Sequence, residues 1–344
     1  MDLTSPLILM CVAALVLFDY TNGFHDTANM VAAVIASQAM TPLQAILLIS
    51  VFTFLGPLLG GTAVADTLGQ FIHLSDYAAA QGVAIVLAAV LGAISWNLLT
   101  WWRGLPSSSS HALVGGLVGA VLVSAGSDHV NWGWTMLWQT GQWSGVTKIV
   151  TALLFSPLAG LLVGYLLFSL LRLLLRRATP SANQPLRRLQ WLGAAGLAFS
   201  HGTNDAQKSM GVITMVLVLG GVLPDFQVPD WVILLCATAI TLGTASGGWR
   251  IVRTVGFGIF KLRPTHALAS QLSAASVIST AAALGGPVST THVVSSSIMG
   301  TGAADRPKAV RWGKAGEIAF TWLVTLPATA VMSAVIQIAL SISL

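Results

Sequence analysis

The sequence predicts an all-α polytopic membrane protein made of two inverted-topology repeats, with broken or re-entrant helices that meet at the bilayer midplane. Three observations predict this fold class: a composition suited to lipid, a series of apolar segments that occurs twice, and loop charges that differ between the two copies. Counting the apolar segments gives an expectation of about 10–12 membrane segments.

The composition fits a chain whose main solvent is lipid. Hydrophobic residues make up 55% of the 344 residues and charged residues only 8%, whereas a soluble domain has roughly 25% charged residues. A bilayer solvates such apolar surface directly, so a soluble class is excluded and membrane lipid is the expected surrounding. The net charge is +5, but the basic residues flank apolar segments instead of forming one face, which excludes nucleic acid as a partner.

Apolar segments long enough to span or enter a bilayer occur in two series. The first series lies at 7–20, 27–40, 43–65, 79–101 and 108–125, followed by 147–171. The second lies at 191–203, 208–223, 231–248, 266–284 and 288–303, followed by 312–341. The expected organisation is a first inverted repeat at 1–125, a polar stretch and membrane helix at 126–171, a basic cytoplasmic linker at 172–190, a second inverted repeat at 191–303 and a final membrane helix at 304–344.

Loop charges indicate that the two copies face opposite sides of the membrane. The loop 66–77 has no Lys or Arg, while its counterpart 249–263 has four, and the loops 124–133 and 305–314 differ in the same way. Because Lys and Arg concentrate in cytoplasmic loops, one loop of each pair is expected outside and the other inside. With a cytoplasmic linker, this predicts a multi-pass protein of the cytoplasmic (inner) membrane with both termini extracytoplasmic. Arg103 is an exception whose place is left open.

The first repeated motif contains a carboxylate in an apolar surrounding. Asn22-Gly-Phe-His-Asp-Thr-Ala-Asn29 aligns with His201-Gly-Thr-Asn-Asp-Ala-Gln-Lys208 at a shift of 179 residues. Asp26 and Asp205 each follow a glycine, which we expect to break the preceding helix. Helix N-capping is the alternative role of these aspartates, but their repetition favours a functional site, because intramembrane ionisable groups normally mark one.

The second repeated motif predicts two helix starts. Pro-Ser-Ser-Ser-Ser-His111 aligns with Pro-Val-Ser-Thr-Thr-His292 at a shift of 181 residues. A helix N-terminus offers amide donors and partial positive charge, which suits an anion. The hydroxyls expected to add donors are Ser108, Ser109, Ser110, Ser289, Thr290 and Thr291. Backbone bonding or close packing is the alternative for either segment, whereas a matched pair of broken helices favours a midplane site.

The two carboxylates would repel an anion unless a cation accompanies it. We expect a coupling Na⁺ or H⁺ held by Asn22, Asp26, Asn29, Asn204 and Asp205. Lys208 takes the place of Asn29 in the second copy and is expected to neutralise Asp205 or contact the anion, with snorkelling to an interface as the alternative. The histidines His25, His111, His201 and His292 are candidates for a proton relay. These histidines are weak candidates for a metal site, because no ligand spacing such as His-x-x-x-His is present. No catalytic group, no cofactor and no metal beyond Na⁺ is expected.

At these residues the sequence resembles the inorganic phosphate transporter (PiT) family, as a bacterial or archaeal phosphate permease. The resemblance implies a phosphate symporter coupled to Na⁺ or H⁺ that works by alternating access, with the Asp motifs and Ser/Thr segments forming the cation and phosphate sites. Relatives that carry sulfate or a divalent metal phosphate complex keep those substrates open. The sequence departs from the sodium-coupled pattern at Gln207 and Lys208, so the resemblance does not imply two equivalent sodium sites.

Three other interpretations follow from the residues. A sulfate or other oxyanion carrier would use the same hydroxyls and helix starts. An intramembrane hydrolase using His25 and Asp26, or a serine of 107–110, needs only one constellation, whereas both copies are retained here, so an enzyme is not expected. A passive channel is the third. The expected partner is a small inorganic anion, and the oligomeric state is left open, with a homodimer as one option.

Overall fold

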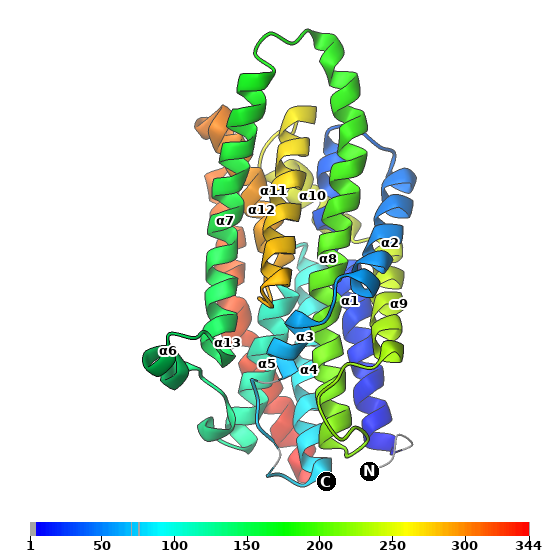
Figure 1. Ribbon diagram of the computed structural model, residues 1–344, viewed down its shortest axis with the longest axis vertical. Coiled ribbons are helices and arrows are strands. Elements are labelled where there is room, and N and C mark those ends of the chain that lie inside the picture. Colours follow the sequence, from blue (N-terminus) through cyan, green and yellow to red (C-terminus); the bar gives the residue numbers. More distant parts are fainter. Residues whose placement is uncertain (1–4, 70, 75, 344) are drawn as a thin grey trace.

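The computed structural model describes residues 5–69, 71–74 and 76–343, and these residues form a helical bundle (Figure 1). Within them are 13 α-helices, three short 3₁₀ turns and no strand beyond one isolated bridge. The first half contains α1 (Pro6–Ala36), α2 (Pro42–Leu59), α3 (Ala63–Gly69), α4 (Ala79–Arg103), α5 (Ser109–Ser124), α6 (Trp134–Thr140) and α7 (Gly145–Leu174). The second half contains α8 (Asn183–Leu219), α9 (Asp230–Ser246), α10 (Trp249–Gly258), α11 (Pro264–Ala283), α12 (Thr290–Asp305) and α13 (Trp312–Ser343).

Five of these helices, α1, α2, α4, α7 and α13, are each long and apolar enough to cross a membrane. Helices α9 and α10 add a sixth span if they are taken together, since they are separated by a short break with a 75° bend. Helices satisfy their own backbone hydrogen bonds, which is the condition for lying in lipid. The all-helical fold class is therefore confirmed.

The first long helix of each half, α1 and α8, runs in the opposite direction to the other. In Figure 1, α1 rises from the end where both termini lie, whereas α8 descends from the opposite end, where it connects to α7. The packing pairs match as well: α1 packs on α9 and α2 on α8, while α7 packs along α12 and α13 along α5. This is the arrangement that inverted repeats would produce. The last long helix of each half packs on the opposite half: α7 lies along α12, and α13 lies along α5.

The helices predicted to break at the Asp motifs are continuous, so that prediction is wrong. Helix α1 passes through Gly23 without interruption, and α8 passes through Gly202. A Cβ on Gly23 would collide with the carbonyl oxygen of Ile240 on α9, and one on Gly202 with that of Thr53 on α2. These glycines therefore allow backbones to touch where helices cross, instead of ending a helix. Asp26 and Asp205 lie inside helices and cap neither.

Both predicted helix starts at the serine-rich segments are confirmed. Helix α5 begins at Ser109 after an N-cap at Ser108, and α12 begins at Thr290 after an N-cap at Ser289. We call α4–α5 with its tip 104–108 the first hairpin, and α11–α12 with its tip 284–289 the second hairpin. Their short helices start near the middle of the molecule and run to opposite ends (Figure 1).

The polar motifs lie between two apolar cores. Along α1, residues from Ile8 to Phe18 belong to one cluster of buried hydrophobic side chains and residues from Ala28 to Val34 to the other. Along α8 the order is reversed, with Ala194–Ala198 in the second cluster and Ala206–Leu217 in the first. Because the two helices run oppositely, their polar middles fall into one layer. The expected linker shortens to 175–182, since α7 ends at Leu174 and α8 begins at Asn183.

Candidate functional site

The two motif carboxylates meet in the polar layer. Asp26 and Asp205 are 1% and 0% exposed. The Thr290 hydroxyl lies 3.1 Å from Oδ2 of Asp26 and 3.2 Å from Oδ2 of Asp205. A hydroxyl has one proton and can donate to only one of these oxygens at a time. Whichever carboxylate Thr290 donates to, Oδ2 of the other one faces the hydroxyl oxygen without receiving its proton. An added positive charge would be favoured at that place.

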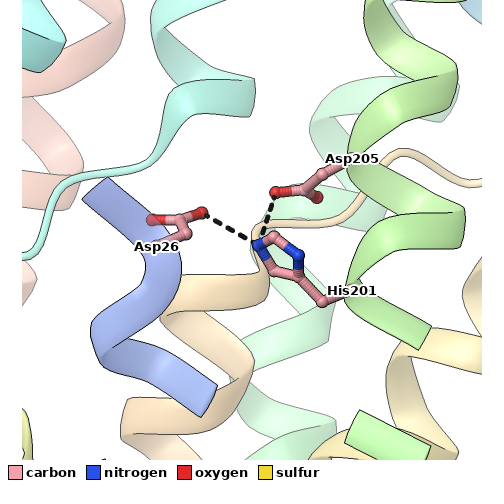
Figure 2. Close-up of side chains that lie close together, drawn as sticks. All are labelled: Asp26, His201 and Asp205. Atoms are coloured by element: carbon pink, nitrogen blue, oxygen red, sulfur yellow. Dashed lines mark ion pairs between the residues drawn. The ribbon is translucent and has the colours of Figure 1, made fainter. Parts of the chain in front are cut away.

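His201 lies between the same carboxylates (Figure 2). Its Nε2 atom is 3.7 Å from Oδ2 of Asp26 and 3.4 Å from Oδ2 of Asp205. One ligand atom from each of the three residues lies within 4.8 Å of the others, which is close enough to surround a cation. His25 contacts the far side of Asp26, with Nδ1 2.9 Å from Oδ1. A proton or cation between two buried carboxylates this close would relieve their mutual repulsion.

Each motif reaches across to the carboxylate of the other half. The Asn22 amide donates to Oδ2 of Asp205 over 3.4 Å. His201, which takes the position of Asn22 in the second copy, approaches Asp26. The first position of each motif therefore contacts the opposite half, and the two halves form one site.

The last position of each motif binds the opposite hairpin. Asn29 on α1 donates to the Thr291 hydroxyl of the second hairpin over 2.9 Å. Lys208 on α8 donates to the Ser110 hydroxyl of the first hairpin over 2.5 Å. Thr291 also donates to Oδ1 of Asp26 over 3.0 Å. The hydroxyls predicted to line the site are thus placed against the residues predicted to hold charge.

Lys208 has three partners and no exposed surface. Its ammonium group donates to Oδ1 of Asp205 over 2.5 Å, to Ser110, and to the carbonyl oxygen of Val288 over 3.2 Å. An ammonium group has three N–H donors, so all three are in use. The predicted pairing with Asp205 is present, and the snorkelling alternative is wrong. Through Ser110 and Val288 the same side chain joins both hairpins.

The three asparagines have different surroundings. Among the described residues, the amide oxygens of Asn22 and Asn29 are buried without a hydrogen-bond partner. The amide oxygen of Asn204 accepts from the backbone N–H of Val288 over 3.3 Å, and its NH₂ group donates to the carbonyl oxygen of Gly286 over 3.2 Å. Asn22 and Asn29 therefore retain free oxygens of the kind that a hard cation takes, while Asn204 holds the second hairpin tip.

The remaining serines and histidines lie at the two helix starts. Ser108 and Ser289 accept from the backbone N–H groups of His111 and His292, at 3.2 and 3.3 Å, so both act as N-caps. Ser109 is buried at the start of α5. The rings of His111 and His292 lie 4.6 Å apart. The two helix starts are thus in contact, and their amide ends converge on the layer that contains the carboxylates.

A short helix of the opposite half holds each hairpin tip. The Thr67 hydroxyl on α3 donates to the carbonyl oxygen of Gly285 over 2.7 Å, and Thr254 on α10 donates to that of Gly104 over 3.0 Å. Both glycines have φ of +67°, a left-handed conformation that favours glycine. We call these two hydrogen bonds the tip contacts. Lys148 on α7 adds a 3.0 Å bond to Thr67, on one side only.

Two residues that the sequence analysis left unassigned now have a place. Asp19 on α1 is 0% exposed and accepts a 2.5 Å hydrogen bond from the Ser209 hydroxyl on α8. The signal was an ionisable residue within the apolar segment 7–20, which marks a functional candidate.

Arg103 is exposed at the end of α4 and lines a surface pocket with Arg250 and Arg253. Arg103 is therefore next to the basic loop 249–263 of the second repeat.

Comparison with known proteins decides the family. The sequence profile of the phosphate transporter family matches residues 22–333, which include both motifs and both hairpin tips. The chain belongs to the phosphate transporter family. Membership confirms the resemblance found in the sequence and places the chain among membrane transport proteins and not among enzymes.

Relatives and a solved structure agree with that membership. The chain is 41% identical over 337 residues to a Bacillus subtilis (strain 168) protein named "Probable low-affinity inorganic phosphate transporter", with 97% of each chain covered. It is 41% identical over 334 residues to a Rhizobium meliloti (strain 1021) protein of the same name, with 96% of each covered. A solved structure titled "The sodium-dependent phosphate transporter" has a TM-score of 0.84 at 23% identity, covering 98% of this chain and all of that one. That likeness supports the fold.

Proposed function

We propose that this family member is a secondary active symporter that carries inorganic phosphate together with Na⁺ or H⁺ by alternating access. One observation carries the proposal: the starts of α5 and α12 meet beside a buried pair of carboxylates and a buried lysine. Helix starts and an ammonium group suit an oxyanion, and paired carboxylates suit a cation. The relatives named as inorganic phosphate transporters support phosphate as that oxyanion.

The anion would bind where Lys208 and the hairpin hydroxyls converge. All three donors of Lys208 are occupied, so an arriving phosphate must replace Asp205, Ser110 or the Val288 carbonyl. Replacing Asp205 would leave that carboxylate without its partner. Phosphate binding that displaces Asp205 from Lys208 would require another positive charge at Asp205, which would tie the anion to a cation.

The coupling cation would lie between Oδ2 of Asp26 and Oδ2 of Asp205. Both oxygens approach Thr290 and His201, and the unpartnered amide oxygens of Asn22 and Asn29 belong to the same motifs. Na⁺ would use these oxygens, whereas a proton would sit on one carboxylate. A divalent ion entering with phosphate is the other option, since His201 adds a nitrogen ligand.

Alternating access would use the two tip contacts. Thr67–Gly285 and Thr254–Gly104 hold the two hairpins in equivalent ways. The charged and hydroxyl residues between them are closed to solvent, with Asp26, Lys208 and Thr290 each at most 2% exposed. Release of one tip at a time would open the site to one side of the membrane. With the linker 175–182 cytoplasmic, the termini would be extracytoplasmic.

Uptake into liposomes containing the purified protein tests the proposal. We expect radioactive phosphate to accumulate against its gradient when an inward Na⁺ or H⁺ gradient is imposed, with chelator present to remove divalent ions. Accumulation only after adding a divalent ion would assign a metal phosphate complex as substrate. Transport of sulfate with no transport of phosphate would overturn the substrate, and equilibration without accumulation would overturn symport in favour of a channel.

A further inference from the structure

Asp19 is a buried carboxylate that the paired-aspartate site does not use. It lies seven residues before Asp26 on α1, two helical turns away and on the same side of the helix. Oδ1 accepts the Ser209 hydroxyl over 2.5 Å, while Oδ2 has no hydrogen-bond partner among the described residues. The Cys236 thiol on α9 faces the same carboxylate. Asp19 thus forms a second acidic position beside the first.

The surroundings of Asp19 favour a proton over a metal cation. No Lys, Arg or His in the described part of the chain lies within 4.0 Å of it, unlike Asp26 and Asp205. An ionised carboxylate without a cation is costly to bury, so a ligand of positive charge is needed. Na⁺ requires several oxygen ligands, whereas the Ser209 hydroxyl is the one oxygen that hydrogen-bonds Asp19 among the described residues, and Cys236 adds a soft sulfur. A proton needs only the carboxylate itself.

Asp19 is connected to the anion site through α8. Ser209, its hydrogen-bond donor, follows Lys208 directly, and Lys208 is paired with Asp205. Lys208 and Asp205 on α8 and Cys236 on α9 are the titratable groups close enough to affect the charge of Asp19. Neutralising Asp19 removes a negative charge from the field at Lys208, which leaves the ammonium group more attractive to an anion. Proton binding and anion binding then favour each other, as symport requires.

The first half alone carries this acid. The position equivalent to Asp19 at the shift of 179 residues is Ala198. The repeated fold therefore does not require a carboxylate at this place. Asp19 and Lys208 are both departures from the repeat, and the helices that carry them, α1 and α8, pack against each other.

We propose that Asp19 is a proton-binding site of this transporter, separate from the Asp26–Asp205 pair, and that its proton is taken up and released in each transport cycle. The inference rests on the proposed symport of phosphate and assigns the coupling ion. Proton uptake makes the carboxyl group neutral while phosphate is bound, and proton loss restores the carboxylate in the returning empty protein.

The experiment compares wild type with Asp19→Asn, which resembles the protonated acid in shape and charge. In liposomes, phosphate accumulation and internal pH are measured together under an inward H⁺ gradient, and phosphate exchange is measured with equal phosphate and pH on both sides. We expect Asp19→Asn to lose accumulation by at least about tenfold, which corresponds to about 1.4 kcal/mol of driving free energy, and to lose proton entry, while exchange continues. Asp225→Asn, an exposed aspartate, is the matched control and should behave like wild type.

Proton-driven accumulation in Asp19→Asn with the same proton entry per phosphate would overturn the inference, as would wild-type transport driven by Na⁺ without proton entry. No phosphate movement in wild type would instead refute the proposed function. If Asp19→Asn does not fold, Ser209→Ala carries the test, because the ionised carboxylate loses its donor. Its exchange rate should then fall off at higher pH than in wild type, and an unchanged pH profile would overturn the inference.

Discussion

The two halves of the site use equivalent positions but different side chains. On α1 the last motif residue, Asn29, is neutral and donates to a hydroxyl of the second hairpin, whereas on α8 the equivalent Lys208 is charged and donates to a hydroxyl of the first. The first motif residue, Asn22 or His201, reaches the opposite carboxylate in each half. The shared positions fix the geometry of the site. The differences place the positive charge of Lys208 on α8 and the additional acid, Asp19, on α1.

The largest expected effect comes from the residues that the halves share. Asp205→Asn leaves the buried Lys208 without its counter-charge, and removing one partner of such a pair costs about 3–5 kcal/mol. We therefore expect the initial rate of phosphate uptake into liposomes to fall by at least about 100-fold for Asp205→Asn. A similar loss is expected for Asp26→Asn, which removes the charge of the carboxylate that contacts Thr290 and His201. Asp230→Asn, an exposed aspartate at the start of α9, serves as control. Wild-type uptake by either site variant would remove that aspartate from the site.

The next effect comes from the position where the halves differ in charge. Lys208→Asn gives α8 the residue that α1 has, and it removes the ammonium group that we expect to contact phosphate. Because charge-assisted hydrogen bonds are worth about 1.5–3 kcal/mol, we expect KM for phosphate to rise by about 10- to 100-fold. Lys261→Asn changes an exposed lysine in the same way and should leave KM unchanged. An unchanged KM in Lys208→Asn would mean that the anion binds elsewhere.

Removing either tip contact should change the ratio of the two open states by a similar factor, but in opposite directions. Thr67→Val and Thr254→Val each remove one hydroxyl-to-carbonyl bond with little change in shape, at a cost of about 1 kcal/mol. Each variant should favour opening of the hairpin that it released, changing the ratio of the two open states by about fivefold. Labelling of cysteines placed on either side of the site measures this ratio. Thr238→Val on exposed α9 surface is the control, and shifts in the same direction would contradict separate gates.

The smallest effect concerns the N-caps, where the halves are most alike. Ser108→Ala and Ser289→Ala each remove the side chain that accepts the backbone N–H of a histidine. Loss of an N-cap costs about 1 kcal/mol, so both variants should lower the melting temperature of the detergent-solubilised protein slightly and equally. A clear difference between the two would show that one serine has a role beyond capping.

The sequence allowed much of this site to be predicted because its motifs are repeated. Matched serine-rich segments predicted two helix starts, and matched aspartates predicted a shared site; Lys208, Ser110, Thr290 and Thr291 all lie there. Continuity of α1 and α8 was not predictable from Gly23 and Gly202 alone, because a glycine permits both a break and a close helix crossing, and only the packing partner decides.

Asp19 escaped prediction for a different reason. It has no counterpart in the second half, where Ala198 takes its place, so a search by repetition passes over it. Its partner Ser209 follows a motif residue but lies 190 positions away in the chain. The contact exists because α1 and α8 pack side by side, and the order of residues along either helix does not reveal it.

Helices α7 and α13 each pack on a hairpin of the opposite half, and this affects how the protein is assembled during synthesis. Helix α7 is already made when its partner α12 emerges, whereas α5 must wait for α13, the last helix of the chain. Until then, Gly115 and Gly119 of α5 lack the backbone of α13 that they approach closely in the folded protein. The first hairpin therefore spends most of translation incompletely packed, the condition in which chaperones and proteases recognise a chain. A ribosome that stalls before α13 would deliver a second hairpin that is docked and a first that is not.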